Sequence, residues 1–287
     1  MHKLEDLSVS LSDGRTITGA SFGPETGRPV LLIAGAATSK LMTFGTELLS
    51  EMNVRLLTMD RPGMGGATPD PARTLTSTAA DYFAFLTAVL GPQAKRVSVI
   101  ANSQGAVFGL ALAITHRVKN LVLVSPADEL AYPPIRAMLP PEATMLPDLV
   151  KSRPDAAEEI LSGFTAQAME EMVLAGSSPL DAAFYSSEPF RSLYRASLAE
   201  GFAHGGTGYV QDTLIAMGAW ELELSEIGCP VQVIFGAHDH SHSPDQGKTL
   251  AERIPGAIRT VYPDGGGAVL WTHSREILSS AFRDEAR

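Results

Sequence analysis

The chain has 287 residues, of which 45% are hydrophobic and 19% charged, a balance typical of a globular protein with a large core. Its formal net charge of -10 argues against a nucleic-acid partner, and its single cysteine, Cys229, excludes an intrachain disulfide. The charged opening from Met1 to Asp6 and the lack of an apolar run of roughly 20 residues predict neither secretion nor a membrane span, so we expect a cytoplasmic location.

The first part of the chain predicts strands. Residues 7–11 and 15–22 flank Ser12-Asp13-Gly14, which indicates a hairpin. Short, continuous apolar runs, as in strands covered on both faces, follow at residues 30–34, 54–59, 97–101 and 121–124.

Helical patterns lie between these strands. Residues 77–90 place apolar side chains on one stripe, with Thr78-x-x-Asp81 as a candidate capping box. Residues 104–117 are apolar on nearly every side, as in a helix buried against a sheet. The alternation predicts a parallel sheet with right-handed crossovers.

The alternation stops after Ser125 and resumes near the C-terminal end. Residues 128–213 contain no convincing strand and read as helical over 156–175 and 189–201. The later elements are a strand at 231–235, a helix at 245–254, a strand at 258–262 and a last helix near 269–282. We therefore expect a core formed by residues 1–127 and 214–287, with residues 128–213 inserted as a helical cap.

Four of the predicted strand ends carry unusual loops, and ligand sites of open parallel sheets form at such ends. The four loops are Ile33-Ala34-Gly35-Ala36-Ala37-Thr38, Asp60-Arg61-Pro62-Gly63-Met64-Gly65-Gly66, Ala101-Asn102-Ser103-Gln104-Gly105 and Gly236-Ala237-His238-Asp239. The third is a strand, a sharp turn that carries a serine, and then a helix, which is how a nucleophile elbow is built. A plain helix N-cap is the alternative for Ser103.

In this order the loops resemble those of the α/β-hydrolase family, over nearly the whole chain, with Ala101 at the first glycine of G-x-S-x-G. The resemblance implies an α/β-hydrolase fold in which Ser103 is the nucleophile and Asp239 the acid. It also implies an oxyanion hole formed by the backbone N–H groups of Ala36 and Gln104. The implied reaction is hydrolysis of a carboxylic ester or lactone through an acyl-serine intermediate, without a cofactor or metal.

The expected general base is missing from this pattern. The family places its histidine after the last strand, and the alignment that fits best puts Gly267 there. Since a glycine cannot move a proton, we expect a slow or inactive enzyme. Three explanations stay open: a variant inactivated to trap a ligand, a natural non-hydrolytic relative that binds a small molecule, or a different histidine that serves as base.

Three histidines, His238, His240 and His242, flank Asp239. They could bind a metal, but the other predicted strand ends add no ligand except Asp60, so a solvated loop is favoured. One of them could reach Ser103 as a substitute base, although acid and base would then share one loop.

The remaining candidates have simpler interpretations. Asp60 and Arg61 are expected to brace their loop, His273 to be structural, and His204 to lie where the insertion ends, a place from which it could line the pocket. The cap is rich in methionines and aromatic residues, which suggests an apolar acyl or lactone group in the substrate. These residues are Met138, Met145, Met169, Met172, Phe164, Phe184 and Tyr185.

Overall fold

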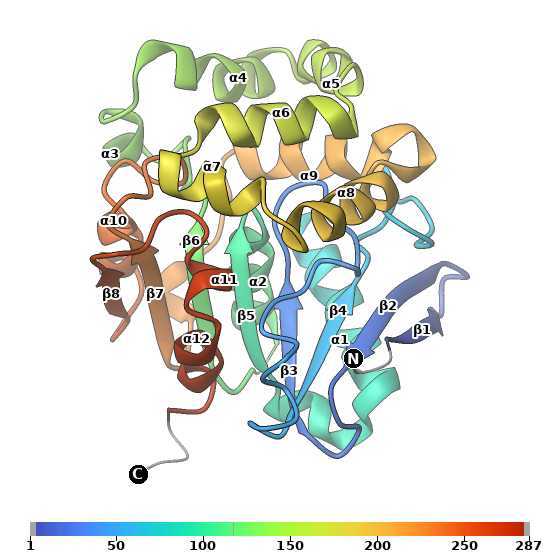
Figure 1. Ribbon diagram of the computed structural model, residues 1–287. Coiled ribbons are helices and arrows are strands. Elements are labelled where there is room, and N and C mark those ends of the chain that lie inside the picture. Colours follow the sequence, from blue (N-terminus) through green and yellow to red (C-terminus); the bar gives the residue numbers. More distant parts are fainter. Residues whose placement is uncertain (1–3, 117, 284–287) are drawn as a thin grey trace.

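A computed structural model of the protein describes residues 4–116 and 118–283 (Figure 1). Within these residues eight strands form one sheet, in the order β1-β2-β4-β3-β5-β6-β7-β8. The pairs β1–β2 and β2–β4 are antiparallel, and all the other neighbouring strands are parallel. The predicted hairpin and the predicted parallel sheet are therefore confirmed.

The strands are β1 (Glu5–Ser10), β2 (Thr16–Phe22), β3 (Arg28–Ile33), β4 (Val54–Met59), β5 (Ser98–Ser103), β6 (Leu121–Pro126), β7 (Val231–Gly236) and β8 (Ile258–Tyr262). The helices of the core are α1 (Leu75–Leu90), α2 (Gly105–Thr115), α10 (Lys248–Glu252), α11 (Val269–Thr272) and α12 (Ser274–Ser280).

The central strands are mainly apolar because helices cover both faces of the sheet (Figure 1). On β3, Leu31 and Ile33 pack into the cluster that includes α1 and α2. Leu32, which points the opposite way, packs into the second cluster with α12. The two cores fix the sheet and bring the carboxyl ends of β3, β5, β6 and β7 to one edge.

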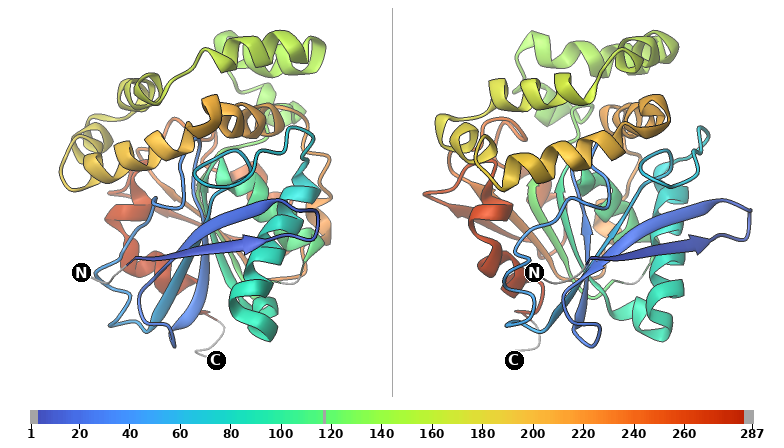
Figure 2. Two further views of the ribbon diagram at one scale, coloured as in Figure 1. Left: turned by 90° about the vertical axis from the view of Figure 1, so that its right-hand side faces the viewer. Right: turned by 45° about the vertical axis from the view of Figure 1, so that its right-hand side comes forward.

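A layer of helices lies over that edge (Figures 1 and 2). It contains α3 (Pro133–Arg136), α4 (Pro141–Ser152), α5 (Pro154–Ser162), α6 (Ala166–Gly176), α7 (Pro179–Tyr185), α8 (Phe190–Gly201) and α9 (Thr207–Met217). We propose that this layer is the cap expected over residues 128–213, with α9 leading back into the core. Among the described residues no helix is both long and apolar enough to span a membrane.

Three local expectations differ from the structure. The capping box of α1 pairs the N-cap residue Thr74 with Ser77 of the first helical turn, in place of the expected Thr78 and Asp81. Asp81 is instead buried and accepts hydrogen bonds from Arg15. The helix expected over 156–175 is two helices, because Thr165 caps a new one at α6. The last helix is likewise broken, at His273, into α11 and α12.

Candidate active site

The turn between β5 and α2 places Ser103 at the edge of the sheet. Its φ of 52° lies in the left-handed region, which is strained for a serine and typical of a nucleophile elbow. A Cβ on Gly105 would lie 2.4 Å from the carbonyl oxygen of Ile33, so only glycine fits there. Ala101 is accommodated by Gly109 of α2, where a Cβ would come within 2.8 Å of the alanine's. The small residues of the elbow thus allow the close strand–helix contact.

The loop after β3 lies against the hydroxyl of Ser103. A Cβ on Gly35 would be 3.6 Å from Ser103 Oγ, so this loop passes beside the hydroxyl. Ala36 and Gln104 line the same cavity as Ser103. Neither of their backbone N–H groups donates a hydrogen bond to another described residue. Both are therefore available to a ligand oxygen.

The buried side chain of Arg61 holds the loop after β3 in place. Arg61 donates hydrogen bonds to the carbonyls of Ala34 and Gly35, at 3.0 and 2.9 Å. Its charge is paired with Asp212 of α9, which also binds Arg73. All three ionic side chains are buried. Arg61 thus has the bracing position that the sequence predicts, and it ties the loop to α9.

Asp60 is also a bracing residue. Its buried carboxylate accepts hydrogen bonds from Thr18 Oγ1 and from the backbone N–H of Lys40, both at 2.6 Å. Burial raises the pKa of Asp60, and these hydrogen bonds partly oppose that effect. The residue does not line the cavity that contains Ser103.

The loop after β7 carries a buried carboxylate, Asp239, which is 1% exposed. It accepts hydrogen bonds from the backbone N–H and the hydroxyl of Ser241, both at 3.2 Å. Each of its oxygens lies 3.0 Å from Nδ1 of His242. Burial alone would raise the pKa of Asp239, but the charge and hydrogen bond of His242 hold it well below its usual value.

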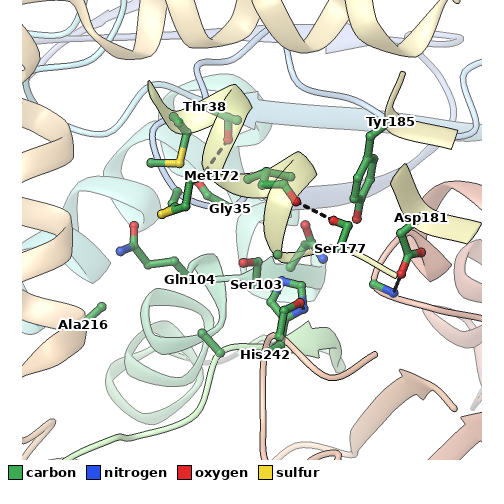
Figure 3. Close-up of a pocket in the computed structure, with 18 of the residues that line it drawn as sticks. Gly35, Thr38, Ser103, Gln104, Met172, Ser177, Asp181, Tyr185, Ala216 and His242 are labelled. Atoms are coloured by element: carbon green, nitrogen blue, oxygen red, sulfur yellow. Dashed lines mark hydrogen bonds between the residues drawn. The ribbon is translucent and has the colours of Figure 1, made fainter. Parts of the chain in front are cut away.

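His242 points from this loop into the cavity, with its side chain 19% exposed. Figure 3 shows its imidazole directed toward Ser103. Because Nδ1 faces the carboxylate, Nε2 is the nitrogen left for the cavity. Burial lowers the pKa of His242, but the charge and hydrogen bond of Asp239, together with the charge of Asp181, outweigh it and leave the pKa raised. The backbone is fixed as well, since the His242 carbonyl accepts from the N–H of Asp128 at 3.2 Å.

Gly267, the position at which the sequence places the missing base, lies beside this pair. A Cβ on Gly267 would be 3.5 Å from Cε1 of His242 and 3.7 Å from Oδ1 of Asp239. A side chain at 267 would therefore begin close to the acid. The imidazole of His242 borders the space that such a side chain would use.

None of the other histidines in residues 4–116 and 118–283 lines the cavity that contains Ser103. His238 and His240 are exposed, and His204 contacts the carbonyl of Gly65 at 3.2 Å. His273 pairs with Asp264 at 3.4 Å, a structural position as predicted. In the described parts of the chain, no three His, Cys, Asp or Glu side chains form a group that could hold a metal ion.

The cap contacts the β8 loop through the carboxylate of Asp181, which is 3% exposed. It accepts the backbone N–H groups of Gly267 and Ala268, both at 2.9 Å, and the hydroxyl of Ser178 at 2.8 Å. A Cβ on Gly266 would lie 2.3 Å from this carboxylate. The glycines of the loop thus let α7 dock directly on it.

The cavity between cap and sheet edge has a volume of about 420 Å³ and a mainly apolar wall. Of the cap residues expected there, Met169, Met172 and Tyr185 line it. Phe164 and Phe184 pack in neighbouring clusters instead. Met138 and Met145 are exposed on the outside of the cap.

Three solved structures similar to the chain illustrate how varied proteins of this shape are. An esterase from Thermogutta terrifontis is 19% identical with a TM-score of 0.70, over 96% of each chain. An enol-lactonase from Burkholderia xenovorans LB400 is 18% identical with a TM-score of 0.68, over 96% of this chain and 98% of that one. A bromoperoxidase from Bacillus anthracis is 18% identical with a TM-score of 0.67, over the same shares. At these identities the likeness shows the fold alone.

The search of curated proteins found no match. The alpha/beta hydrolase family, in contrast, matches residues 30–279, which include the β3 loop, the elbow, Asp239 and Gly267. Together with the observed sheet and its flanking helices, this match means that the chain belongs to the alpha/beta hydrolase family.

Proposed function

We propose that the protein hydrolyses a carboxylic ester or lactone, with Ser103 as nucleophile, His242 as general base and Asp239 as the acid that orients it. The observation that carries the proposal is the position of His242. Its Nδ1 is 3.0 Å from both oxygens of Asp239, and its ring lies beside Ser103 in the same cavity (Figure 3). Of the three explanations for Gly267, this geometry favours a different histidine as base.

The proposed reaction follows from the available atoms. Nε2 of His242 takes the proton of Ser103 Oγ as the oxygen attacks the substrate carbonyl carbon. The N–H groups of Ala36 and Gln104 bind the oxyanion, an effect worth about 3–4 kcal/mol per donor in well-studied cases. His242 then gives the proton to the departing alkoxide. Water then attacks the acyl carbon as His242 takes its proton, and His242 returns that proton to Ser103 Oγ as the bond to the serine breaks and the carboxylic acid leaves.

The cavity favours an uncharged, largely apolar substrate. Its wall includes Met169, Met172, Val173 and Trp220, which offer no charge to a ligand. Two carboxylates disfavour a negative charge near the scissile bond: Asp181 lines the cavity from the cap, and Asp239 lies behind His242.

The test is hydrolysis of p-nitrophenyl butanoate by the wild type and single variants. We expect Ser103→Ala and His242→Ala each to lower kcat by about 10⁴- to 10⁶-fold, as removal of a nucleophile or base does. His238→Ala and His240→Ala are matched controls, because these exposed histidines of the same loop should leave kcat unchanged. Normal turnover by His242→Ala would overturn the proposed base, and normal turnover by Ser103→Ala would overturn the proposed function.

A second candidate, a non-catalytic small-molecule binding protein, is favoured by Gly267 at the usual position of the base. A fluorophosphonate probe separates the two. Stoichiometric labelling of Ser103 that is lost in His242→Ala supports the hydrolase, since labelling needs an activated hydroxyl. Absence of labelling in a wild-type protein that binds esters reversibly supports the binding protein.

A further inference from the structure

The hydroxyl of Tyr185 enters the cavity from the cap, at the end of α7. Its ring is fixed by aromatic contacts with Phe190 and Trp271, at centroid distances of 5.2 and 6.1 Å. The hydroxyl oxygen would be 3.5 Å from a Cβ on Gly267, as Cε1 of His242 would be. Tyr185 and His242 therefore border the space at residue 267 from two sides. A rigid ring with this orientation presents its hydroxyl at a fixed place next to the proposed base.

This hydroxyl has no hydrogen-bond partner among the described residues, although polar neighbours surround it. The Ser177 hydroxyl donates to the carbonyl of Val173 at 2.6 Å, and Asp181 accepts from the β8 loop. Burial, with the charges of Asp181 and Asp239, raises the pKa of Tyr185 well above its usual value, so the hydroxyl keeps its proton. A protonated, unpaired hydroxyl that lines a cavity is suited to donate a hydrogen bond to a ligand.

The position of Tyr185 assigns it to one part of the substrate. Figure 3 shows Tyr185 and Asp181 on one side of Ser103, and Gln104 and Ala216 on the other. His242 must pass its proton to the leaving oxygen, so the departing alcohol lies on the side of the base. The space at Gly267, which Tyr185 and His242 share, is next to that oxygen.

We propose that Tyr185 Oη donates a hydrogen bond to an uncharged acceptor oxygen in the alcohol portion of the substrate, such as an ether, keto or hydroxyl oxygen. The charges of Asp181 and Asp239 disfavour a carboxylate in the same place. The inference rests on the proposed function, because it takes His242 as the group that protonates the leaving alcohol. It makes the protein selective for oxygen-bearing alcohols over purely alkyl ones of equal size.

The test compares pairs of esters in which an ether oxygen replaces one methylene group. On the alcohol side the pairs are 2-methoxyethyl butanoate with n-butyl butanoate and 3-methoxypropyl butanoate with n-pentyl butanoate. On the acyl side the pair is methyl 4-methoxybutanoate with methyl hexanoate. The measured quantity is the ratio of kcat/KM within each pair, in the wild type and in Tyr185→Phe. Comparing the two proteins cancels the intrinsic reactivity of each ester.

We expect Tyr185→Phe to lower the preference for the ether in at least one alcohol-side pair by about fivefold, the effect of one hydrogen bond. The acyl-side ratio should not change. Tyr209→Phe is the matched control, because it removes a hydroxyl from the cap outside the cavity and should leave all three ratios unchanged.

Two results would overturn the inference. In the first, Tyr185→Phe changes the rates of both members of every pair equally, which is a structural effect. In the second, only the acyl-side ratio responds, which places Tyr185 on the wrong side. If either result is found while Ser103→Ala and His242→Ala are inactive, only the inference on Tyr185 fails and the proposed function stands. Turnover by Ser103→Ala, in contrast, refutes the proposed function itself.

Discussion

The loop after β7 and the loop after β8 meet beside Asp239, yet only the β7 loop carries an imidazole. The β7 loop supplies Asp239 and, three residues later, His242, whose ring reaches the cavity. The β8 loop supplies Gly267, which has no side chain to offer. Under the proposed function, the contrast teaches that a base is specified by where its ring lies relative to Ser103 and Asp239, and residues 242 and 267 both lie close to that acid.

The difference between the loops has local causes. In the β7 loop, the N–H of Ser241 donates to Asp239 Oδ1, which curls the chain and turns His242 back toward the carboxylate. In the β8 loop, Gly266 and Gly267 leave room for Asp181 of the cap. One loop thus bends around the acid, while the other forms a docking surface for α7.

The largest effect is expected when the imidazole is moved from the β7 loop to the β8 loop. We expect the double variant His242→Ala/Gly267→His to recover at least about 100-fold of the kcat/KM lost in His242→Ala, because a base contributes about 10²- to 10⁴-fold to proton transfer. A Cβ at 267 lies 3.7 Å from Asp239 Oδ1, and loss of the His242 ring makes room for the new imidazole. The measurement is hydrolysis of p-nitrophenyl butanoate.

The control for relocation is His242→Ala/Gly267→Ala, which has the same backbone change without an imidazole and should stay inactive. Gly267→His alone should give no gain, since two imidazoles would compete for Asp239. A double variant that folds but remains as slow as His242→Ala would mean that residue 267 is not a vacated base position.

Removing the carboxylate of Asp181 tests the other part of this comparison, the docking of α7 on the β8 loop. We expect Asp181→Ala to lower the free energy of unfolding by about 3 kcal/mol, because it removes charge-assisted hydrogen bonds and leaves the N–H groups of Gly267 and Ala268 unpaired. Urea denaturation measures the change. The control is Asp148→Ala, which breaks an exposed ion pair with Arg136 and should cost less than about 1 kcal/mol. Equal losses in the two variants would show that the cap does not depend on Asp181.

The sequence predicts the core well because its signals are local. The apolar runs at β3, β4, β5 and β6 lie between two helical layers, and such burial leaves a mainly apolar pattern, which Arg55 and Thr58 interrupt in β4. Ser103 and Asp239 are recognisable because Ser103 is the last residue of one buried strand, β5, and Asp239 lies three residues after the end of another, β7. Their roles remain proposals, although the structure brings both side chains to one edge of the sheet.

His242 could not be assigned from the sequence for a physical reason. An extended loop would place His238, His240 and His242 on one side and Asp239 on the other, which separates base from acid. The hydrogen bonds of Ser241 and the Asp128 N–H contact curl the loop, and they bring residue 242 to the acid. The signal available was the serine two residues after the aspartate, an arrangement that favours a turn. Asp181, 86 residues from Gly267, gives no such local signal.

The pH dependence of catalysis tests the coupling within the β7 loop. Because Asp239 and Asp181 raise the pKa of His242, we expect the acid limb of kcat/KM to lie above 6.5, the usual value for histidine. Below that limb His242 is protonated and cannot accept the proton of Ser103. Tyr185, which also faces the ring, stays neutral over this range because its pKa is raised. A limb at or below 6.5 would contradict the coupling.

Asp181→Asn should move this limb toward lower pH, because it removes one of the negative charges that favour protonated His242. Asp148→Asn, an exposed substitution elsewhere in the cap, should leave the acid limb in place.

The contribution of His242 to stability changes with pH in the opposite direction to its contribution to catalysis. The ion pair of His242 with Asp239 stabilises the fold fully below about 6.5, and this contribution is lost as the pH rises through the raised pKa of His242. The difference in unfolding free energy between wild type and His242→Ala should therefore shrink over the same interval in which kcat/KM of the wild type increases. If the two curves change at different pH values, the group that governs catalysis is not His242.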